Sequence, residues 1–475
     1  MSTVTIQIGQ LSNFVGQHMW NAHVANVRAR HVDGSVALDD AEKAIPRCLV
    51  VDFGHSLGQL SLDSGVVASA THNRKVFDGG RRAAQAAWPG AVHVFGDRGD
   101  VDDNNDGDED VDVDPPVFEY AHRLTGATIA ADEALDTPFW SDYSLVRYRR
   151  NSLHQLHEHQ LANVNEFGGF ATGERVWARD AEADELDNRL RVLFESCDRV
   201  AAVTMLCDVD DSFGGVAAQM LFRLSDEVPK AWQTAFAFLN KDSAAQAATP
   251  AIAGVRALSI NALQQHASLF SIVSPLAAQC RFAPQPRHNL YRAAAVLATP
   301  LQAFLDGPRR LSRQHDAASV AKMLSHTRNL FALRASIPFA ETELFLTPPP
   351  SASAWTYGAH ASVYAVSFAG RALAADVDAR PATMHERFDA PFSLPRSHPA
   401  HRGARIPSTS VRVEAGAPTY LGRTLAALLD DAGRGDRSAR RLCGHANGVE
   451  EDDVLAALAD IENAFDVPRD ERDDD

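Results

Sequence analysis

Lysine, cysteine and long apolar runs are scarce in this chain, and each scarcity excludes a class of protein. Lysine supplies only 5 of the 45 basic residues, a bias of composition rather than a sign of a cationic recognition surface. The five cysteines form no C-x-x-C pair, which is typical of reduced thiols in a cytosolic protein rather than of a disulfide framework or a zinc finger. No apolar stretch is long enough to span a bilayer, and the opening MSTVTIQIG lacks the features of a leader peptide. We therefore expect a soluble protein of the cytosol or of the outer face of an organelle.

The excess of negative charge is confined to two short segments. The chain has 62 acidic and 45 basic residues, but residues 97–114 carry a net charge of −9 and residues 470–475 carry −4. Such segments do not bury apolar surface, so we predict an acidic disordered loop at 97–114 and an acidic tail at 467–475. The rest is nearly neutral, which excludes extensive nucleic-acid binding because that needs clustered cations. Part of the loop imitates an EF-hand, but Val113 stands where the bidentate glutamate is required, so we expect no specific calcium site.

The pattern of apolar residues predicts an α/β fold. Residues 4–9 alternate β-branched and polar side chains, residues 10–27 have helical spacing, and residues 46–53 form a short continuous apolar run. A strand, a helix and a second, fully buried strand are typical of a βαβ nucleotide-binding fold with parallel strands. The later expected elements are a strand at 199–209 and helices at 184–198, 256–270, 291–305, 424–431 and 450–465.

Two further features of the pattern bear on organisation. We expect Pro300 to interrupt the helix at 291–305, and the Pro-rich segments around 345–358 and 381–408 to be connections. The predicted division of the chain is an N-terminal segment (1–96), the acidic loop (97–114), a continuation of the core with central helices (115–310), a C-terminal α+β region (311–466) and the acidic tail (467–475).

The segment IQIGQLSNFVGQHMW resembles the opening of tubulins, in which G-Q-x-x-N-x-x-G-x-x-x-W joins the first strand to the first helix. The matching residues are Gly9, Gln10, Asn13, Gly16 and Trp20. PRCLVVDF is similar to the tubulin segment that carries an acid on the metal side, here Asp52. Four later segments narrow the resemblance to the Misato family, tubulin-related proteins of mitochondrial distribution and morphology: WSDYSLVRYRRNSL (140–153), FESCDRVAAVTMLCDVDDSFGGVAA (194–218), ALSINALQQHASLF (257–270) and YRAAAVLATPLQAFLD (291–306).

The resemblance implies a tubulin-like, Rossmann-type domain with a mainly parallel sheet, followed by a smaller α+β domain and C-terminal helices. It also implies a role in mitochondrial distribution, morphology and inheritance. The implied partners are proteins, tubulin or the chaperonin machinery among them, and not nucleic acid. The implied location is cytoplasmic and mitochondrial, peripheral to the outer membrane and without a membrane span.

The phosphate-binding loop of tubulins has the motif G-G-G-T-G-S-G, and this chain retains little of that motif. The corresponding stretch includes Asp211, Ser212, Phe213, Gly214 and Gly215, and only Gly215 coincides with a family glycine. Phe213 adds bulk where the backbone has to approach a phosphate, and Asp211 adds negative charge. We therefore predict no cofactor and no enzymatic activity, with a cation held by Asp208, Asp210 and Asp211 as the alternative that would restore GTP binding.

Other parts of the pocket are open to two interpretations. Asn261 stands where a tubulin-like asparagine would recognise guanine, or it lies on a polar helix face; Gln10 and Asn13 contact nucleotide, or they cap the first helix. No acid occurs between Ser274 and Asn289, where tubulins carry the loop that completes hydrolysis. The residues of this degenerate pocket are Gly9, Gln10, Asn13, Asp52, Asp211, Ser212, Gly214, Gly215 and Asn261.

The histidines of HQLHEH do not match a zinc motif. His154, His157 and Glu158 would share one face of a helix, but H-E-x-x-H is absent, so we expect a polar helical surface and no metal. The sequence thus favours a non-enzymatic, Misato-like protein. A GTP-binding switch or weak GTPase with a remodelled phosphate loop is one alternative, and a cytosolic cofactor of tubulin folding or of spindle microtubule assembly is another.

Overall fold

A computed structural model describes most of the chain outside one long gap. The described residues are 2–54, 56–57, 139–160, 168–239, 249–275, 290–309, 317–325, 329–337, 344–347, 363–368, 383–388, 391–395, 398–399, 408–418 and 420–465. The acidic loop with its EF-hand pattern, the acidic tail and most of the stretch between Ser274 and Asn289 lie outside them. The predictions for those segments therefore stay predictions.

A six-stranded parallel sheet forms the centre of the fold. Its order is β5-β4-β1-β6-β7-β8, and every neighbouring pair is parallel. The strands β4, β6 and β8 are mostly apolar, as expected for strands buried under helices on both faces of the sheet, whereas β5 is mostly polar. Their bounds are β1 Ser2–Ile8, β4 Cys48–Gly54, β5 Leu153–Gln160, β6 Val200–Asp208, β7 Trp232–Phe238 and β8 Leu269–Val273.

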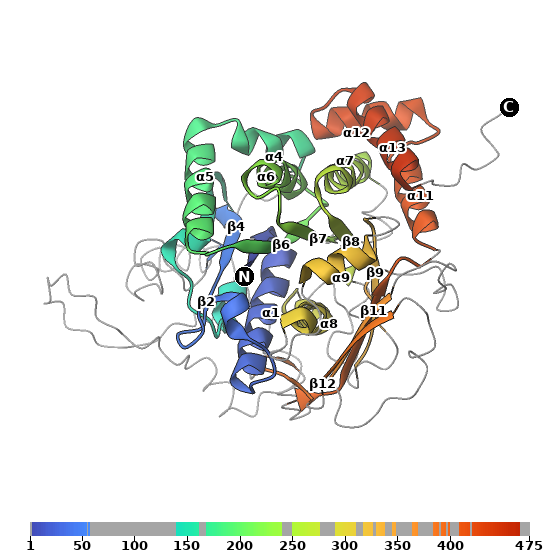
Figure 1. The fold of residues 1–475 in the computed structure, drawn as a ribbon. Helices are drawn as coiled ribbons and strands as arrows, with labels where there is room; N and C mark the ends of the chain where they lie inside the picture. The colour runs from blue at the N-terminus through green and yellow to red at the C-terminus, as the bar shows by residue number, and fades with distance from the viewer. Residues whose placement is uncertain are drawn as a thin grey trace, which may run out of the picture.

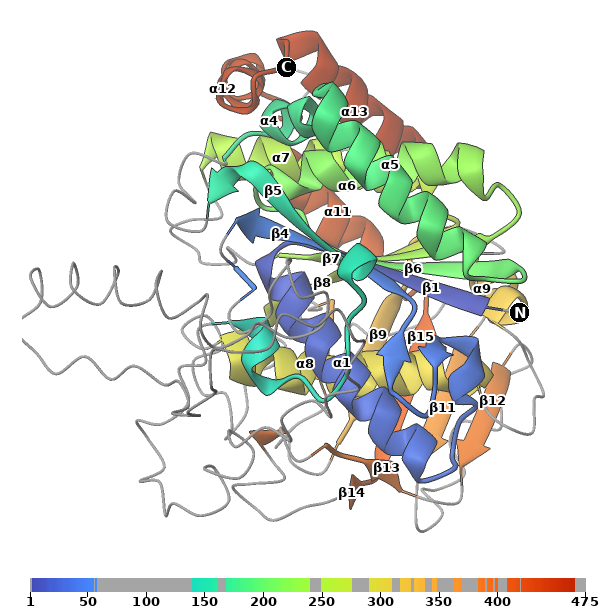
Figure 2. The same cartoon turned by 90° about the vertical axis from the view of Figure 1, so that its left-hand side faces the viewer.

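The helices form a layer on each face of this sheet (Figure 1). One layer consists of α4 (Phe170–Trp177), α5 (Asp180–Glu195), α6 (Phe213–Glu227) and α7 (Pro250–His266). The other consists of α1 (Gln10–Arg28), α8 (Leu290–Asp306) and α9 (Ala317–Leu324). Figure 2 shows α5 lying across the β4 and β5 side of the sheet. The C-terminal helices α11 (Leu421–Asp431), α12 (Arg437–Asn447) and α13 (Glu451–Phe465) pack on α7.

A second sheet lies beyond α8, so that α8 is enclosed between two sheets (Figure 1). Its order is β10-β9-β15-β11-β12, and β11 and β12 are parallel while the other pairs are antiparallel. The bounds are β9 Ala332–Ser336, β10 Leu344–Phe345, β11 Val363–Phe368, β12 Thr383–Phe388 and β15 Val411–Gly416. Among the described residues there are also two short antiparallel pairs, β2 (Leu38–Asp40) with β3 (Ile45–Pro46) and β13 (Phe392–Ser393) with β14 (Ser408–Thr409).

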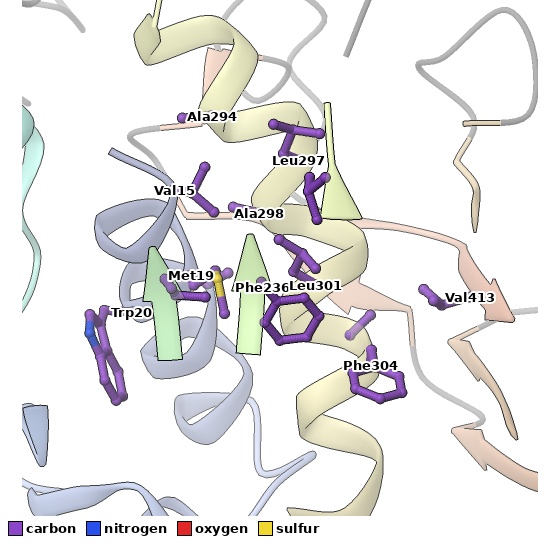
Figure 3. Packing of buried hydrophobic residues seen from close by; sticks show 14 of the residues in the cluster. Val15, Met19, Trp20, Phe236, Ala294, Leu297, Ala298, Leu301, Phe304 and Val413 are labelled. Atoms are coloured by element: carbon purple, nitrogen blue, oxygen red, sulfur yellow. The ribbon is translucent and has the colours of Figure 1, made fainter. Parts of the chain in front are cut away.

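The helix α1 is buried on almost every side. Val15 and Met19 face Leu297 and Leu301 of α8 close to Phe236 of β7 (Figure 3), and 15 of the 19 residues of α1 are buried. Polar residues on its other faces are buried as well, and each donates to or accepts from a different part of the chain. They are Ser12, Asn13, Gln17, His18, Asn21, His23 and Asn26.

The structure confirms the predicted α/β class, with a parallel sheet, a further sheet and C-terminal helices, and corrects four predictions. The helix predicted at 256–270 is α7, which ends at His266, and residues 269–270 belong to β8, because the apolar run LFSIV is buried in the parallel sheet. Residues 153–160 form the strand β5 rather than a helix. Pro300 lies inside an unbroken α8, because packing between two sheets outweighs the hydrogen bond that proline cannot make. The segment 381–408 is not only a connection, since it contains β12, which pairs with β11.

Candidate functional site

The candidate site lies at the carboxyl ends of β1, β4 and β6. From β1 the chain moves outward to β4 and then β5, and it returns to form β6 on the other side of β1. The order of the strands therefore reverses between β1 and β6. In open parallel sheets, ligands bind outside the carboxyl ends of the strands at such a reversal.

The turn between β1 and α1 is closed by a carboxylate of the protein itself. Oδ2 of Asp208, the last residue of β6, accepts a hydrogen bond from the N–H of Leu11 at 2.9 Å, and Oδ1 accepts one from the N–H of Ser12 at 2.9 Å. The Ser12 hydroxyl donates to the same Oδ1 at 2.5 Å. Gly9 allows this approach, because its φ is 111° and a Cβ there would lie 2.7 Å from Cβ of Asp208. The carboxylate thus occupies the anion-binding position at the N-terminus of α1.

The surroundings of Asp208 disfavour its ionised form. Burial, together with repulsion from Asp211, raises its pKa to about 8, while hydrogen bonds from Ser12 and Leu11 act in the opposite direction. The ordinary value for an aspartate is 3.8. Asp208 is therefore a buried acid whose charge is opposed by its surroundings and supported by three donors.

Asp52, at the end of β4, is also fully engaged. Asn13 donates from Nδ2 to Oδ2 of Asp52 at 2.9 Å, and Trp140 donates from its indole nitrogen to the same oxygen at 2.9 Å. The N–H of Phe53 donates to Oδ1 at 2.7 Å. Burial raises the pKa of Asp52 although these hydrogen bonds lower it. Asn13 and Asp52, both predicted pocket residues, are thus in direct contact, whereas no local pattern indicated Trp140, which lies 88 residues further along the chain than Asp52.

The predicted phosphate loop is the start of α6. The carboxylate of Asp211 accepts the N–H of Phe213 at 3.0 Å, and the Ser212 hydroxyl donates to the carbonyl of Gly169 at 2.7 Å. Phe213 is fully buried and packs edge-on against Phe53, with 4.7 Å between the ring centroids. Donors and space at the start of α6 are therefore taken up by the protein.

Gly214 and Gly215, the two glycines of the loop, lie where neighbouring helices leave no room for a side chain. A Cβ on Gly214 would lie 2.1 Å from Oγ of Ser259 in α7, and one on Gly215 would lie 2.1 Å from the carbonyl oxygen of Phe170 in α4. Across the same contact, a Cβ on Gly173 would lie 1.8 Å from the carbonyl oxygen of Ser212. These glycines let α4 and α7 approach α6 closely, a role that the loop sequence alone did not suggest.

The remaining predicted residues are separate from this cluster or only beside it. Gln10 is half-buried at the first position of α1. Asn261 lies in the second half of α7, which runs toward the amino ends of the strands and connects to β8 at Leu269, so it is not brought to the carboxyl edge. Asp210 forms a buried bidentate ion pair with Arg256, at 2.7 and 3.1 Å.

Within the described ranges, no group of three or more histidine, cysteine, aspartate or glutamate side chains could hold a metal ion. Asp208, Asp210 and Asp211 each face a partner of their own, so they do not assemble the bridging cation site considered as an alternative. In the same part of the chain, no helix is both long and apolar enough to cross a membrane.

Comparisons with known proteins agree with the resemblance. Residues 1–95 match the Misato Segment II tubulin-like domain, and residues 131–309 match the Tubulin domain. Protein dml-1 of Neurospora crassa is 26% identical over 240 residues, which cover 48% of this chain and 40% of that protein. Protein dml1 of Aspergillus oryzae is 24% identical over 351 residues, 70% of this chain and 66% of that protein. Protein misato of Drosophila melanogaster is 24% identical over 252 residues, 48% of this chain and 43% of that protein.

The match to the Neurospora and Drosophila proteins thus spans less than half of their length. The two matched ranges follow each other along this chain, separated by residues 96–130, and together include every strand of the six-stranded sheet. The chain is therefore tubulin-like, and its resemblance to the Misato family, predicted from its motifs, is confirmed.

Proposed function

We propose that this protein is a non-enzymatic, tubulin-like protein that acts through protein partners in mitochondrial distribution, morphology and inheritance. The observation that supports the non-enzymatic part is the position of the Asp208 carboxylate on the N–H groups of Leu11 and Ser12. That position is where a parallel-sheet fold of this kind would hold a phosphate. Asp208 replaces the ligand with a group that belongs to the chain.

The charges and packing around the site argue for the same conclusion. A phosphate would have to displace the Asp208 carboxylate and then lie beside Asp211, whose charge opposes an anion. Two unit charges about 4 Å apart interact by about 4 kcal/mol at an effective dielectric of about 20, which corresponds to roughly a thousandfold in affinity. Phe213 and the close contact between α4 and α6 fill the second phosphate position.

The nucleotide part of the proposal is tested by equilibrium binding of GTP to the purified chain with and without Mg²⁺. A ligand at 100 times its dissociation constant stabilises the folded state by about 2.7 kcal/mol, so a functional site would give a clear rise in melting temperature. We expect no rise. Tight, Mg²⁺-dependent binding would overturn the proposal and make the protein a nucleotide switch.

The mitochondrial part rests on the Misato resemblance and needs a test in cells. We expect the protein in the cytoplasm and peripherally on mitochondria, and we expect its depletion to alter the distribution of the mitochondrial network. Re-expression of the Asp211→Asn variant, which keeps an acceptor for the Phe213 N–H, should restore distribution as well as the wild type does. A normal network after depletion would contradict the mitochondrial role. A defect in microtubule assembly that precedes any mitochondrial change would favour a cofactor of tubulin folding.

A further inference from the structure

A cluster of histidines and glutamates joins the edge strand β5 to the helix α5, outside the site described above. Nε2 of His154 lies 2.6 Å from Oε1 of Glu182, and Nδ1 of His157 lies 2.8 Å from Oε2 of the same carboxylate. One buried glutamate therefore bridges two histidines of the strand. Glu185, one turn further along α5, lies 3.5 Å from Nε2 of His157 and 3.9 Å from Nδ1 of His154.

The strand itself is irregular where the cluster holds it. β5 pairs with β4 in regular parallel register up to Leu156, which lies opposite Phe53, but the next pair is Gln160 with Gly54. Residues 157–159 therefore bulge out of the ladder. β5 is the last strand of its sheet on this side, so hydrogen bonds from a second neighbouring strand do not support the bulge in the described fold. The side-chain contacts to α5 are the additional support.

We propose that Glu182, His154 and His157 form a pH-sensitive latch that holds the bulged half of β5 on α5 at mildly acidic pH and loosens it as the pH rises. The two histidines differ in access to solvent: the His154 side chain is fully buried, whereas that of His157 is 61% exposed. His157 is thus the group that can exchange its proton freely. Glu182, with a side chain that is only 7% exposed, is the fixed anchor.

The direction of the pH dependence follows from the neighbours. The hydrogen bond to Glu182 raises the pKa of His157 above 6.5, with burial acting against it, Glu185 adding to it and Arg189 opposing it. Burial disfavours the charge of Glu182, but the bonds from the two histidines outweigh burial and lower its pKa. The charged pair is therefore complete at pH values below the ordinary histidine pKa of 6.5 and above the ordinary glutamate pKa of 4.5, and it is lost as the pH rises through the raised pKa of His157.

The other charged groups near the latch do not replace this contact. Arg189 donates from Nη2 to Glu185 and from Nη1 to the carbonyl of Arg150 at 2.8 Å, so it is already engaged on the far side of Glu185. With His157 neutral, Glu182 and Glu185 face each other across the histidines with less positive charge between them. The bulge of β5 is then held mainly by the hydrogen bond between His154 and Glu182.

Hydrogen exchange measured by mass spectrometry on the full chain tests the latch, with labelling times scaled for the intrinsic pH dependence of exchange. Between about pH 6 and about pH 8, protection of peptides covering residues 153–160 should fall roughly tenfold relative to peptides from β1, the effect of one charge-assisted hydrogen bond. His157→Asn should show the low protection at both pH values, and its fold should be intact because the side chain is exposed. Glu182→Gln should behave in the same way if it folds.

Asp184→Asn is the matched control, since Asp184 is an exposed acid on the same helix. This variant should retain the wild-type dependence on pH. Protection of 153–160 that does not change with pH in the wild type would overturn the proposal. A wild-type dependence that persists in His157→Asn would also overturn it, because the responding group would then lie elsewhere.

Discussion

Asp208 joins two turns that are almost two hundred residues apart in the chain. Its carboxylate accepts from two backbone N–H groups and one hydroxyl at the start of α1, and it is almost completely buried. An amide in its place would keep one acceptor but turn an NH2 group toward a backbone N–H. The net structural role of Asp208 is therefore to complete the first turn of α1, as a capping residue does from within the same helix.

We predict that Asp208→Asn lowers the free energy of unfolding by about 1–3 kcal/mol, the cost of leaving a buried donor without a partner. Urea unfolding at about pH 9 would measure the change, because above its pKa of about 8 Asp208 is ionised and can accept all three hydrogen bonds. The control is Asp226→Asn, which alters an exposed acid on α6 and should change stability by less than about 0.5 kcal/mol. An Asp208→Asn protein as stable as the wild type would contradict the capping role.

The raised pKa of Asp208 gives the folded protein a dependence on pH. A carboxyl group that binds its proton more tightly when folded makes the protein less stable as the pH rises from its unfolded pKa of 3.8 to its folded pKa of about 8. Replacing Asp211 by asparagine removes the neighbouring charge while leaving an oxygen to accept the Phe213 N–H.

We therefore predict that Asp211→Asn stabilises the protein near pH 8 and flattens the loss of stability between about pH 6 and about pH 8. Each unit by which the pKa of Asp208 falls is worth about 1.4 kcal/mol at a pH above that pKa. Melting temperatures of wild type and variant across this range would show the difference. Parallel curves for the two proteins would show that Asp211 does not act on Asp208.

Trp20 lies in α1 and is only 3% exposed, which makes it a residue of the core. It packs in the core between the two sheets, edge-on to His23. Trp20→Ala should lower the free energy of unfolding by about 3–5 kcal/mol, as large-to-small changes in cores do. Unfolding in denaturant would measure it. Loss of a binding partner without loss of stability would instead place Trp20 in a binding surface.

At the scale of single residues, the sequence predicted the nearby members of the site and missed the distant ones. Gly9, Asn13 and Asp52 lie in short motifs at the ends of predicted strands, and the resemblance of these motifs to tubulin segments implied that they share one pocket. The contact of Asp208 with α1 and that of Trp140 with Asp52 depend on how strands far apart in the chain are ordered in the sheet. Local periodicity carries no information on that order.

Among the elements, α4 and α6 are held in unusually close contact by glycines. Gly173 faces the carbonyl of Ser212, and Gly215 faces the carbonyl of Phe170. Because each added Cβ would meet backbone rather than a flexible side chain, neither helix can accept even alanine without moving. The glycines that resemble remnants of a phosphate loop therefore have a packing role in this chain.

Gly215→Ala should consequently destabilise the protein by more than about 1 kcal/mol, although alanine is the better helix former by about 1 kcal/mol. Ala218→Gly, three residues further along α6, is the reverse substitution and serves as a comparison. It should lower the free energy of unfolding only through the lower helix propensity of glycine and the loss of one small buried methyl group. Chemical denaturation of the two variants would decide. A stabilising Gly215→Ala would mean that α4 does not press on α6.

The strand β5 shows why one element was predicted wrongly. In LHQLHEHQ, polar residues at mixed spacing fit a helical surface as well as a strand, and the pattern gave no sign that His154 is buried against a carboxylate. The strands with continuous apolar runs, such as β4 and β6, were found because a run of that length fits a parallel sheet and little else. A buried strand made of polar residues, such as β5, has no continuous apolar run by which it could be recognised.

For the whole molecule, the charge distribution gives the remaining prediction. The acidic segment 97–114 lies between the two matched domains and carries a net charge of −9. Its composition does not allow it to bury enough apolar surface to offset chain ordering, so its deletion should leave the melting temperature within a few degrees of the wild type. Calorimetry would test this. A loss of cooperativity after deletion would show that the segment belongs to the fold.

The burial of α1 has a consequence for folding during synthesis of the chain. Its polar residues bind the carbonyl of Tyr143, the carbonyl of Tyr291, the carboxylate of Asp306 and the backbone of Ser393, partners that are synthesised long after it. Asn13 finds its partners Val51 and Asp52 early, but the contacts of α1 are complete only when residue 393 has been made. The helix α1 therefore reaches its final surroundings only after segments far along the chain have been made, and part of its surface stays uncovered until then.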